Sequence, residues 1–327
     1  MTQKHKSRIG IALGGGAARG WAHIGILQQL ADMGIHPEIV SGCSIGSLVG
    51  AAYVADNLNQ LQKWTLSLTK IEMMRYFEFN TTFNGFVRQE RLRQLFHDQV
   101  CARNQSIEGL KKSFASVATN LHNGREVWFT EGPVIDAVWA SIALPGLFQP
   151  VSYEEQWLID GGLVNPVPVS LCRAMGADTV IAVNLNHNLL RTKNRKKSPA
   201  PAPEPTQKQE EQQPSSTSPS GIISSQLVNS VASSLREYSS NLFPDKKDNN
   251  QMPGVIETLA GSIYIMQDKI TRSRMVGDPP ELLLNPRLSD IGLLEFYRAE
   301  EAIEEGRQSV IRMQAEIEHI IDLSMPR

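Results

Sequence analysis

Three glycine-bearing segments of the chain hold residues whose types and spacing could support nucleophilic chemistry. These segments are GGGAARG (14–20), GCSIG (42–46) and DGG (160–162). In the second, Ser44 lies between Gly42 and Gly46, after a strand-like run and before a helical one. A nucleophilic serine on a sharp strand-to-helix turn needs small neighbours at i−2 and i+2, and the N–H of the next residue can stabilise an oxyanion. The segment therefore predicts a nucleophile elbow at Ser44, with the amide of Ile45 as one oxyanion donor.

A serine hydroxyl needs a base before it becomes an effective nucleophile. None of the seven histidines follows a strand in the order Ser…Asp…His of ordinary α/β-hydrolases, and His23 is predicted to pack within a helix. Asp160 comes at the end of the strand-like run QWLI and is followed by Gly161 and Gly162. An isolated DGG usually marks only a tight turn. Without a placed histidine, however, it predicts a Ser44–Asp160 dyad. Because a carboxyl with a pKa of ~4 is a weak base at neutral pH, we expect the surroundings of Asp160 to be desolvated.

The first segment, GGGAARG, follows the strand-like run RIGIAL and opens a helix. Backbone amides in such a turn lack partners and can hold an anion. A dinucleotide-binding turn is the competing interpretation, but its third glycine would fall at Arg19. An anion site is therefore favoured, and nucleotide binding remains a lesser alternative.

The elements that must position these residues alternate between strands and helices. Strand-like runs lie at 8–13, 37–42, 114–120, 126–130, 156–162 and 178–185. Residues 21–34 follow the first of these runs and residues 47–56 follow the second, and both segments show apolar residues at helical spacing. The alternation predicts an α/β fold with a mostly parallel sheet covered on both faces. Further along, we expect a helix over 254–274, a short strand within 278–286 and one long terminal helix.

The chain is predicted to fold as one catalytic core, 8–187, completed by 254–327, with an insertion at 188–253. The insertion begins with a Pro-, Gln-, Lys- and Ser-rich stretch that we expect to be disordered, and its basic cluster could contact anionic lipid headgroups. Residues 222–243 then show amphipathic helical spacing. This helix could pack on the core, form a homo-oligomer contact, or act as a lid or peripheral membrane contact.

Composition limits the classes of partner. The chain has 327 residues, 41% of them hydrophobic and 20% charged, and a net charge of −2. No basic field for nucleic acid is present, and no apolar run approaches the ~20 residues of a membrane span. Cys43, Cys101 and Cys172 form no disulfide or metal pattern, which favours the cytoplasm. No metal-binding motif is found, so neither a metal nor another cofactor is expected.

The three motifs in this order resemble the patatin-like phospholipase family. The stretches GCSIGSLVGAAY, SVATNLHNGREVWFTEG, ASIALPGLFQPV and GADTVIAVNL are similar to its bacterial RssA-like branch. The similarity covers 8–187 and resumes over 255–300. It implies a three-layer α/β/α sandwich and a Ser–Asp dyad that hydrolyses acyl esters of lipids.

By this resemblance, Ser44 matches the nucleophile and Asp160 the base. The oxyanion hole corresponds to the loop amides of Gly15, Gly16 and Ala17, and many relatives have a fourth glycine where this chain has Ala17. Arg19 beside the loop could hold it by hydrogen bonds or meet a substrate phosphate. The alternative to an enzyme is a non-catalytic regulatory or scaffold protein that retains the fold.

Overall fold

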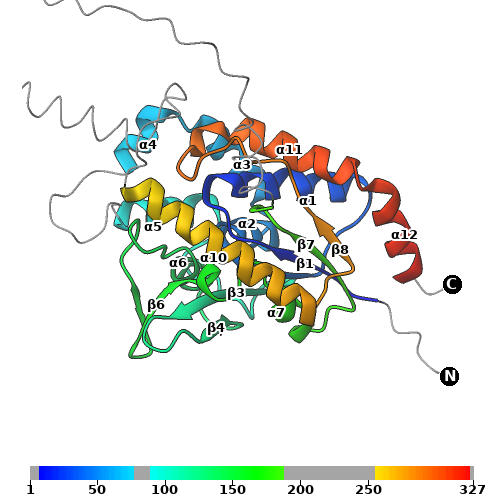
Figure 1. The fold of residues 1–327 in the computed structure, drawn as a ribbon, viewed down its shortest axis with the longest axis horizontal. Helices are drawn as coiled ribbons and strands as arrows, with labels where there is room; N and C mark the ends of the chain where they lie inside the picture. Colours follow the sequence, from blue (N-terminus) through cyan, green and yellow to red (C-terminus); the bar gives the residue numbers. More distant parts are fainter. Residues whose placement is uncertain (1–6, 77–88, 188–254, 325–327) are drawn as a thin grey trace, which may run out of the picture. The chain divides into compact units, whose positions relative to one another are not determined.

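The computed structural model describes residues 7–76, 89–187 and 255–324 (Figure 1). By its internal contacts the chain divides into two units. One unit combines Met1–Leu189 with Leu259–Arg327, and the other is Leu190–Thr258. The first unit holds all the motifs above and is described here. The predicted insertion, 188–253, with its amphipathic helix at 222–243, lies outside the described residues.

An eight-stranded mixed sheet forms the centre of this unit, in the order β5-β6-β3-β2-β1-β7-β8, with β4 paired to β3. The strands are β1 (Ile9–Leu13), β2 (Ile39–Cys43), β3 (Ser113–Asn120), β4 (Glu126–Phe129), β5 (Val151–Tyr153), β6 (Gln156–Asp160), β7 (Thr179–Val183) and β8 (Leu282–Leu284). From β3 to β8 neighbouring strands on this path run parallel, whereas β4, β5 and β6 pair antiparallel. The predicted α/β class with a mostly parallel sheet is confirmed.

Helices cover both faces of the sheet. They are α1 (Ala22–Asp32), α2 (Ile45–Val54), α3 (Leu58–Ser67), α4 (Lys70–Tyr76), α5 (Gln89–Gln99), α6 (Val134–Ser141), α7 (Val169–Ala174), α10 (Val255–Gly277), α11 (Ala299–Ile311) and α12 (Gln314–Ser324). Short 3-10 helices lie at Ala17–Trp21, Gly161–Leu163 and Phe296–Arg298. Helix α2 packs on β2 and β3 and contacts α1 and α6, and α11 lies along α1. Helix α7 packs on the opposite face, against β1, β2 and β7.

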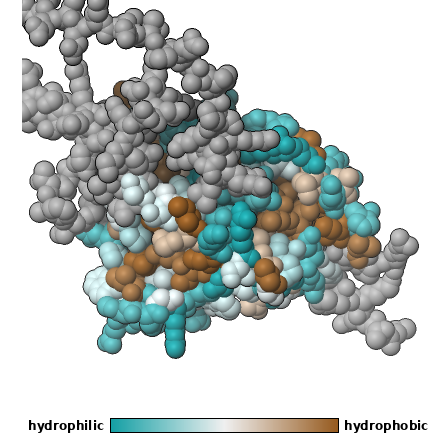
Figure 2. Space-filling view, in the orientation of Figure 1, coloured by the Kyte–Doolittle hydropathy of each residue, from teal (hydrophilic) through white to brown (hydrophobic). Residues whose placement is uncertain are grey.

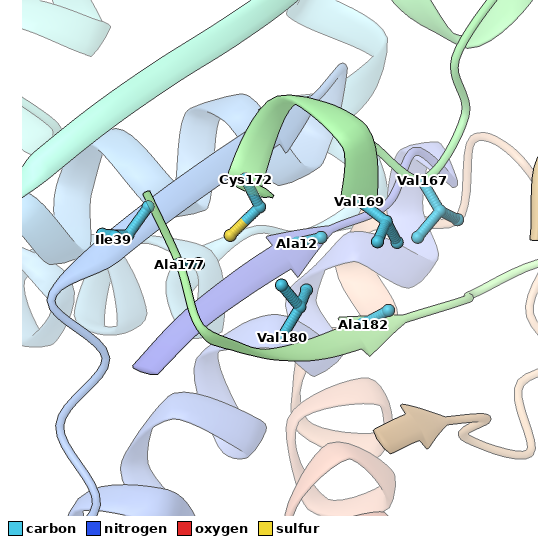
Figure 3. Close-up of a cluster of buried hydrophobic side chains, with 8 residues drawn as sticks. All are labelled: Ala12, Ile39, Val167, Val169, Cys172, Ala177, Val180 and Ala182. Atoms are coloured by element: carbon cyan, nitrogen blue, oxygen red, sulfur yellow. The ribbon is translucent and has the colours of Figure 1, made fainter. Parts of the chain in front are cut away.

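A buried apolar cluster joins α7 to the sheet (Figure 3). Its members come from β1, β2, β7 and the α7 region, and they are Ala12, Ile39, Val167, Val169, Cys172, Ala177, Val180 and Ala182. Met275 of α10 packs against the same cluster. The approach of α7 is close, because a Cβ on Gly10 would lie 2.4 Å from the Cys172 sulfur. The sheet is therefore sandwiched between α1, α2 and α11 on one face and α7 and α10 on the other.

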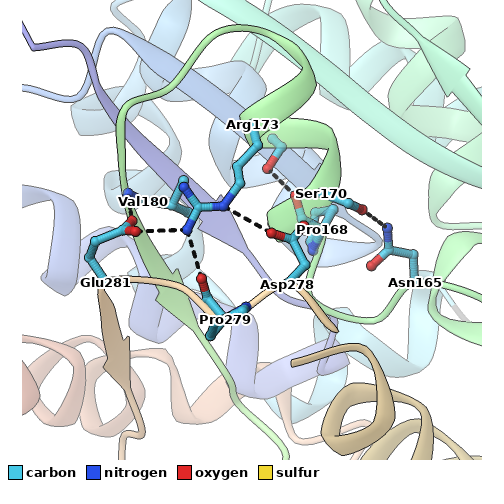
Figure 4. A network of polar contacts seen from close by, with 9 residues as sticks. Asn165, Pro168, Ser170, Arg173, Val180, Asp278, Pro279 and Glu281 are labelled. Atoms are coloured by element: carbon cyan, nitrogen blue, oxygen red, sulfur yellow. Dashed lines mark hydrogen bonds and ion pairs between the residues drawn. The ribbon is translucent and has the colours of Figure 1, made fainter. Parts of the chain in front are cut away.

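A polar network fixes the segment before β8 to α7 and β7 (Figure 4). Arg173 on α7 pairs with Asp278 at 2.9 Å and with Glu281 at 2.8 Å. The second carboxylate oxygen of Glu281 accepts the N–H of Val180 at 2.7 Å. These bonds hold β8 in register at the edge of the sheet, so residues after 254 belong structurally to the sheet that residues before 187 begin.

The strand register brings the predicted site together. On one side of β3, Val117 is opposite Cys43, the residue before Ser44. On its other side Ala118 is opposite Asp160. The glycine-rich turn follows β1, whose Leu13 is opposite Gly42. All three motifs therefore meet at one edge, where ligands of open α/β sheets commonly bind.

The prediction of one long terminal helix is wrong. Helix α11 ends at Ile311, a turn follows at Arg312 and Met313, and α12 begins at Gln314. The apolar positions Val310 and Ile317 are both buried, because the two helices keep the same phase across the turn. The spacing of apolar residues is therefore the same for one continuous helix and for two helices, and it does not reveal the break.

Hydrophobic residues reach the surface at several places between hydrophilic ones on the face drawn in Figure 2. Among the residues that the structure describes, Val276 and Leu323 are the most exposed of the large hydrophobic side chains, at 86% and 72%. Within the described ranges, no helix combines the length and hydropathy that crossing a bilayer requires.

Candidate active site

Ser44 occupies a strained turn between β2 and α2. Its backbone angles are φ 53° and ψ −124°, a left-handed conformation that costs a non-glycine residue about 1–3 kcal/mol. Space is tight on both sides. A Cβ on Gly46 would lie 2.1 Å from the Leu13 carbonyl oxygen, and one on Gly42 would lie 2.4 Å from the Ser47 Cα. The two glycines therefore permit the turn by their small size, as the elbow pattern predicts.

The hydroxyl of Ser44 donates a 2.5 Å hydrogen bond to Oδ2 of Asp160. The other carboxylate oxygen, Oδ1, accepts the backbone N–H of Gly162 at 2.7 Å. A Cβ on Gly161 would lie 2.1 Å from the Val117 carbonyl oxygen, so this turn also needs its glycine. The backbone of Asp160 is held as well, because its carbonyl oxygen accepts the hydroxyl of Thr119 at 2.8 Å. The structure thus places the two predicted dyad residues in direct contact.

Asp160 is 1% exposed. Burial raises its pKa to about 6, against the opposing effect of the hydrogen bonds from Ser44 and Gly162, which favour the ionised form. A carboxyl with this pKa is largely ionised at neutral pH and is a better proton acceptor than an ordinary aspartate. The environment therefore meets the expectation of a desolvated base.

The glycine-rich turn presents a different set of donors from the one expected. The N–H of Gly15 donates to the Pro166 carbonyl oxygen at 2.9 Å, so this amide is already occupied. The N–H of Ala18 is likewise bonded, to Leu293. Among the described residues, the N–H groups of Gly16 and Ala17 have no hydrogen-bond acceptor. The expected oxyanion set is corrected accordingly: Gly15 supports the turn, while Gly16 and Ala17 remain as candidate donors.

Ile45 is the first residue of α2, where backbone N–H groups lack intrahelical partners. The helix N-terminus also carries partial positive charge, which favours an anion there. Ser44 and Asp160 border one small cavity together with Gly16 and Ala17. The candidate oxyanion donors thus come from two segments. Gly16 and Ala17 belong to the glycine-rich turn, and Ile45 begins α2.

Ala17 adopts φ 49°, a conformation that favours glycine. This explains why many relatives are expected to carry glycine at the position. The turn nevertheless forms with alanine, and Ala17 is the first residue of the 3-10 helix that leads into α1.

Arg19 lies inside the protein, 1% exposed. Its Nε donates to the Gly16 carbonyl oxygen at 3.3 Å, and its guanidinium stacks on the Tyr264 ring at 4.2 Å from the centroid. Burial lowers the pKa of Arg19. These contacts fit a role in holding the glycine-rich turn.

His23 is also fully buried, and one ring nitrogen, Nε2, is 2.8 Å from the Gly14 carbonyl oxygen. Burial lowers the pKa of His23 to about 4, so the ring is neutral at physiological pH and Nε2–H donates to that carbonyl. The side chain supports the turn from α1 and has no contact with the dyad among its hydrogen bonds.

An apolar cavity of about 100 Å³ opens beside Ser44. Its walls come from the elbow and from α3, α4, α5 and the segment after α6, and they are Ala17, Trp21, Ser44, Ile45, Leu48, Trp64, Leu68, Met73, Leu92, Phe96, Ile142, Leu144, Leu147, Phe148 and Phe296. Among the described residues of this lining, Ser44 carries the only hydroxyl group, and the others are aliphatic, methionine or aromatic side chains. Such a cavity suits the hydrocarbon part of an acyl group next to the nucleophile.

Ser141, at the end of α6, is a supporting residue of the site that the sequence motifs did not identify. Its hydroxyl accepts the backbone N–H of Ser44 at 2.8 Å and donates to the Val117 carbonyl oxygen at 2.7 Å. The side chain therefore ties the strained elbow to β3. A signal was present, because Ser141 lies in the stretch ASIALPGLFQPV that resembles the family.

The described residues contain no group of three or more His, Cys, Asp or Glu side chains placed to hold a metal ion. Cys43, Cys101 and Cys172 are free and buried, and burial raises the pKa of each thiol. Their thiols are therefore poor nucleophiles at neutral pH.

Comparisons with known proteins identify chains that are similar to this one. Residues 11–173 match the family described as Patatin-like phospholipase. An uncharacterized NTE family protein of Mycobacterium bovis is 30% identical, over 92% of this chain and 89% of its own length. Patatin-like phospholipase domain-containing protein 6 of Mus musculus is 30% identical over 54% of this chain and 13% of its own. The crystal structure of VipD from Legionella pneumophila gives a TM-score of 0.32 at 13% identity, over 95% of this chain and 77% of that one.

Proposed function

Because the chain belongs to the patatin-like phospholipase family, we propose that it is a serine hydrolase that cleaves fatty-acyl esters of lipids through Ser44 and Asp160. One observation carries the proposal. The Ser44 hydroxyl donates to a buried carboxylate at 2.5 Å and also borders an otherwise apolar cavity. A hydroxyl with a base on one side and a hydrocarbon pocket on the other is arranged for attack on an acyl ester.

In the acylation step, Asp160 accepts the proton of Ser44 as Oγ attacks the ester carbonyl carbon. The N–H groups of Gly16, Ala17 and Ile45 stabilise the negative oxygen of the tetrahedral intermediate. Protonated Asp160 then gives its proton to the leaving alcohol, and the acyl group stays on Ser44 as an ester. Water completes the cycle by releasing the fatty acid.

A fluorophosphonate probe tests the proposal, because it reacts covalently with activated serines. Intact mass and peptide mapping should show one adduct, on Ser44. The adduct should be absent in Ser44→Ala and form more slowly in Asp160→Asn, whereas Ser152→Ala, at an exposed serine of β5, should label like the parent protein. A panel of phospholipids, lysophospholipids and glycerides then identifies the acyl donor.

No adduct on the folded protein would contradict the proposal. That result would favour the alternative of a regulatory or scaffold protein that keeps the fold. Full esterase activity in Asp160→Asn would refute the dyad while leaving Ser44 as nucleophile. The cytoplasmic location, the membrane contact and the homo-oligomer remain predictions.

A further inference from the structure

A second, smaller cavity adjoins the dyad on the side of α10. Its volume is about 20 Å³, and it is lined by Gly16, Ala17, Ser44, Leu144, Asp160, Ile263, Tyr264, Gln267 and Leu293. A cavity of this size holds one water molecule if two to four polar groups can bind it. Three of the lining residues, Ile263, Tyr264 and Gln267, come from α10, which follows the 188–254 segment in sequence, and the last two carry polar groups. Neither takes part in the acylation step described above.

The amide of Gln267 is oriented by a chain of hydrogen bonds. Asn186 Nδ2 donates to the Gly15 carbonyl oxygen at 3.3 Å and to Gln267 Oε1 at 2.9 Å. A carbonyl oxygen can only accept, so Asn186 must present its NH₂ group there and Gln267 must present its oxygen. This leaves Gln267 Nε2 as the donor end of the amide, on the side away from Asn186.

That donor lies close to the catalytic carboxylate. A Cβ built on Gly162 would be 2.4 Å from Gln267 Nε2 and 2.9 Å from Asp160 Oδ1. Gln267 Nε2 and Asp160 Oδ1 therefore both lie close to the position that a Gly162 Cβ would occupy. Gln267 itself is only 5% exposed. An amide donor beside a carboxylate, at the wall of a cavity of one-water size, is suited to binding a water molecule together with that carboxylate.

Tyr264 supplies a second polar group. Its hydroxyl is buried and has no hydrogen-bond partner among the described residues. The Arg19 guanidinium lies over the ring, 4.2 Å from its centroid, and its charge also acts on the hydroxyl. A buried hydroxyl without a partner is unfavourable, and a water in the cavity that Tyr264 lines would provide one.

We propose that Tyr264 and Gln267 bind and orient the water molecule that hydrolyses the acyl ester on Ser44. Asp160 accepts a proton from this water as its oxygen attacks the acyl carbonyl carbon. The tetrahedral intermediate collapses, the bond between that carbon and Ser44 Oγ breaks, and Asp160 returns the proton to Oγ. The products are the free carboxylic acid and the original serine. This inference rests on the proposed function, because it concerns the second half of the same reaction.

The test separates acylation from deacylation in the full-length protein. Tyr264→Phe keeps the ring that stacks on Arg19 and removes only the hydroxyl, and Gln267→Met keeps the length of the side chain. With p-nitrophenyl butyrate in stopped flow, each variant should release one equivalent of nitrophenol in a burst at a rate within twofold of the parent protein. Steady-state turnover should fall at least tenfold. Intact mass should show the butyryl group accumulating on Ser44.

Matched controls are Tyr53→Phe and Gln308→Met, which change the same side chains away from the site. Both should keep parent burst and turnover rates. Fluorophosphonate labelling requires no water attack, so Tyr264→Phe and Gln267→Met should label at the parent rate. The added nucleophile hydroxylamine should release the accumulated acyl group as the hydroxamate.

The proposal is overturned if steady-state turnover of the two variants stays at the parent rate. It is also overturned if the burst rate and the turnover rate of the variants fall together and no acyl-enzyme accumulates. Loss of labelling in a variant would also refute it for that residue, because the side chain would then be needed to build the dyad. A parent protein that neither labels nor turns over would refute the proposed function instead. The two failures are therefore distinguishable.

Discussion

Asp160 is an ionisable side chain inside the protein, and its charge lowers the stability of the fold at neutral pH. Burial raises its pKa from an ordinary 3.8 to about 6. Between these two values the folded state binds more protons than the unfolded state, so stability falls as pH rises through this window. The ionised form of Asp160, which the proposed reaction uses as its base, therefore carries a free-energy cost on the order of 3 kcal/mol above pH 6.

Asp160→Asn should abolish most turnover and raise stability at neutral pH. The amide oxygen can accept the N–H of Gly162, and the amide NH₂ can donate to the Ser44 oxygen in a reversed hydrogen bond, without a buried charge. Urea unfolding at pH 7.5 should show a gain on the order of 2–3 kcal/mol that disappears near pH 4. Turnover of the parent protein should increase with pH through about 6, as Asp160 ionises. A variant less stable than the parent at pH 7.5 would contradict the role of burial.

Ala17→Gly should stabilise the protein by roughly 0.5–1 kcal/mol, because glycine adopts the positive φ of this position without the cost that a Cβ imposes. The same change at Ala31, within α1, should destabilise by a similar amount. Urea midpoints measure both. A destabilised Ala17→Gly would mean that the methyl group contributes packing that outweighs the backbone strain.

At this scale, the sequence permitted prediction of the Ser44–Asp160 contact but not of all its supports. The elbow and the DGG turn need glycines because a Cβ at those positions would clash with nearby backbone. The motifs can therefore be found from the sequence alone. Ser141 is a lone serine at the end of an apolar helix, and nothing in its local pattern points to the Ser44 N–H. The occupied amide of Gly15 depends on Pro166, which lies far along the chain.

Helices α1 and α11 approach until their backbones touch. A Cβ on Gly25 would lie 1.9 Å from the Ile303 carbonyl oxygen, and one on Gly306 would lie 2.0 Å from that of Ala22. These distances leave no room for a methyl group. The pair of glycines thus sets how closely the C-terminal part of the chain packs on the helix that follows the glycine-rich turn.

Gly25→Ala should therefore destabilise the protein by on the order of 3 kcal/mol, since the two helices would have to separate. Gly261→Ala is the matched control on α10, where a Cβ would meet nothing within 4 Å. It should be neutral or stabilising by up to about 1 kcal/mol. Chemical denaturation compares the two variants directly, and equal effects would refute the close packing.

Individual elements differed in how far they could be predicted. Strands β1, β2, β3 and β7 stand out as short apolar runs, because parallel strands are buried on both faces. The break between α11 and α12 gives no such signal, since no Pro or Gly marks it and the apolar phase continues. Helix α10 was expected from its spacing. Its place beside the cavity at the dyad was not, because Tyr264 and Gln267 belong to no motif.

Considered as a whole, the catalytic unit depends on residues from both sides of the 188–254 segment. Strand β8 pairs with β7, and α11 packs on α1. Tyr264 and Gln267 also border the cavity at the dyad. The family match ends at residue 173, so it covers the motifs but not these later elements. Membership of the RssA-like branch stays a prediction.

A chain that stops at residue 187 should consequently fail to fold cooperatively. It would lack β8, α10 and α11, and would expose the apolar faces of β7 and α1 to water. Thermal melting followed by circular dichroism should show no sharp transition, and fluorophosphonate should leave Ser44 unlabelled. A cooperative transition with normal labelling would show that the later elements are dispensable.

The position of β8 has a practical consequence. The strand is tied to β7 by ladder hydrogen bonds and to Arg173 by Asp278 and Glu281, none of which requires a continuous chain between 190 and 254. Two separately expressed fragments, one ending at residue 189 and one starting at residue 255, should therefore reassemble when mixed. Ester hydrolysis would then report their association, which makes this protein a natural scaffold for a split-enzyme sensor.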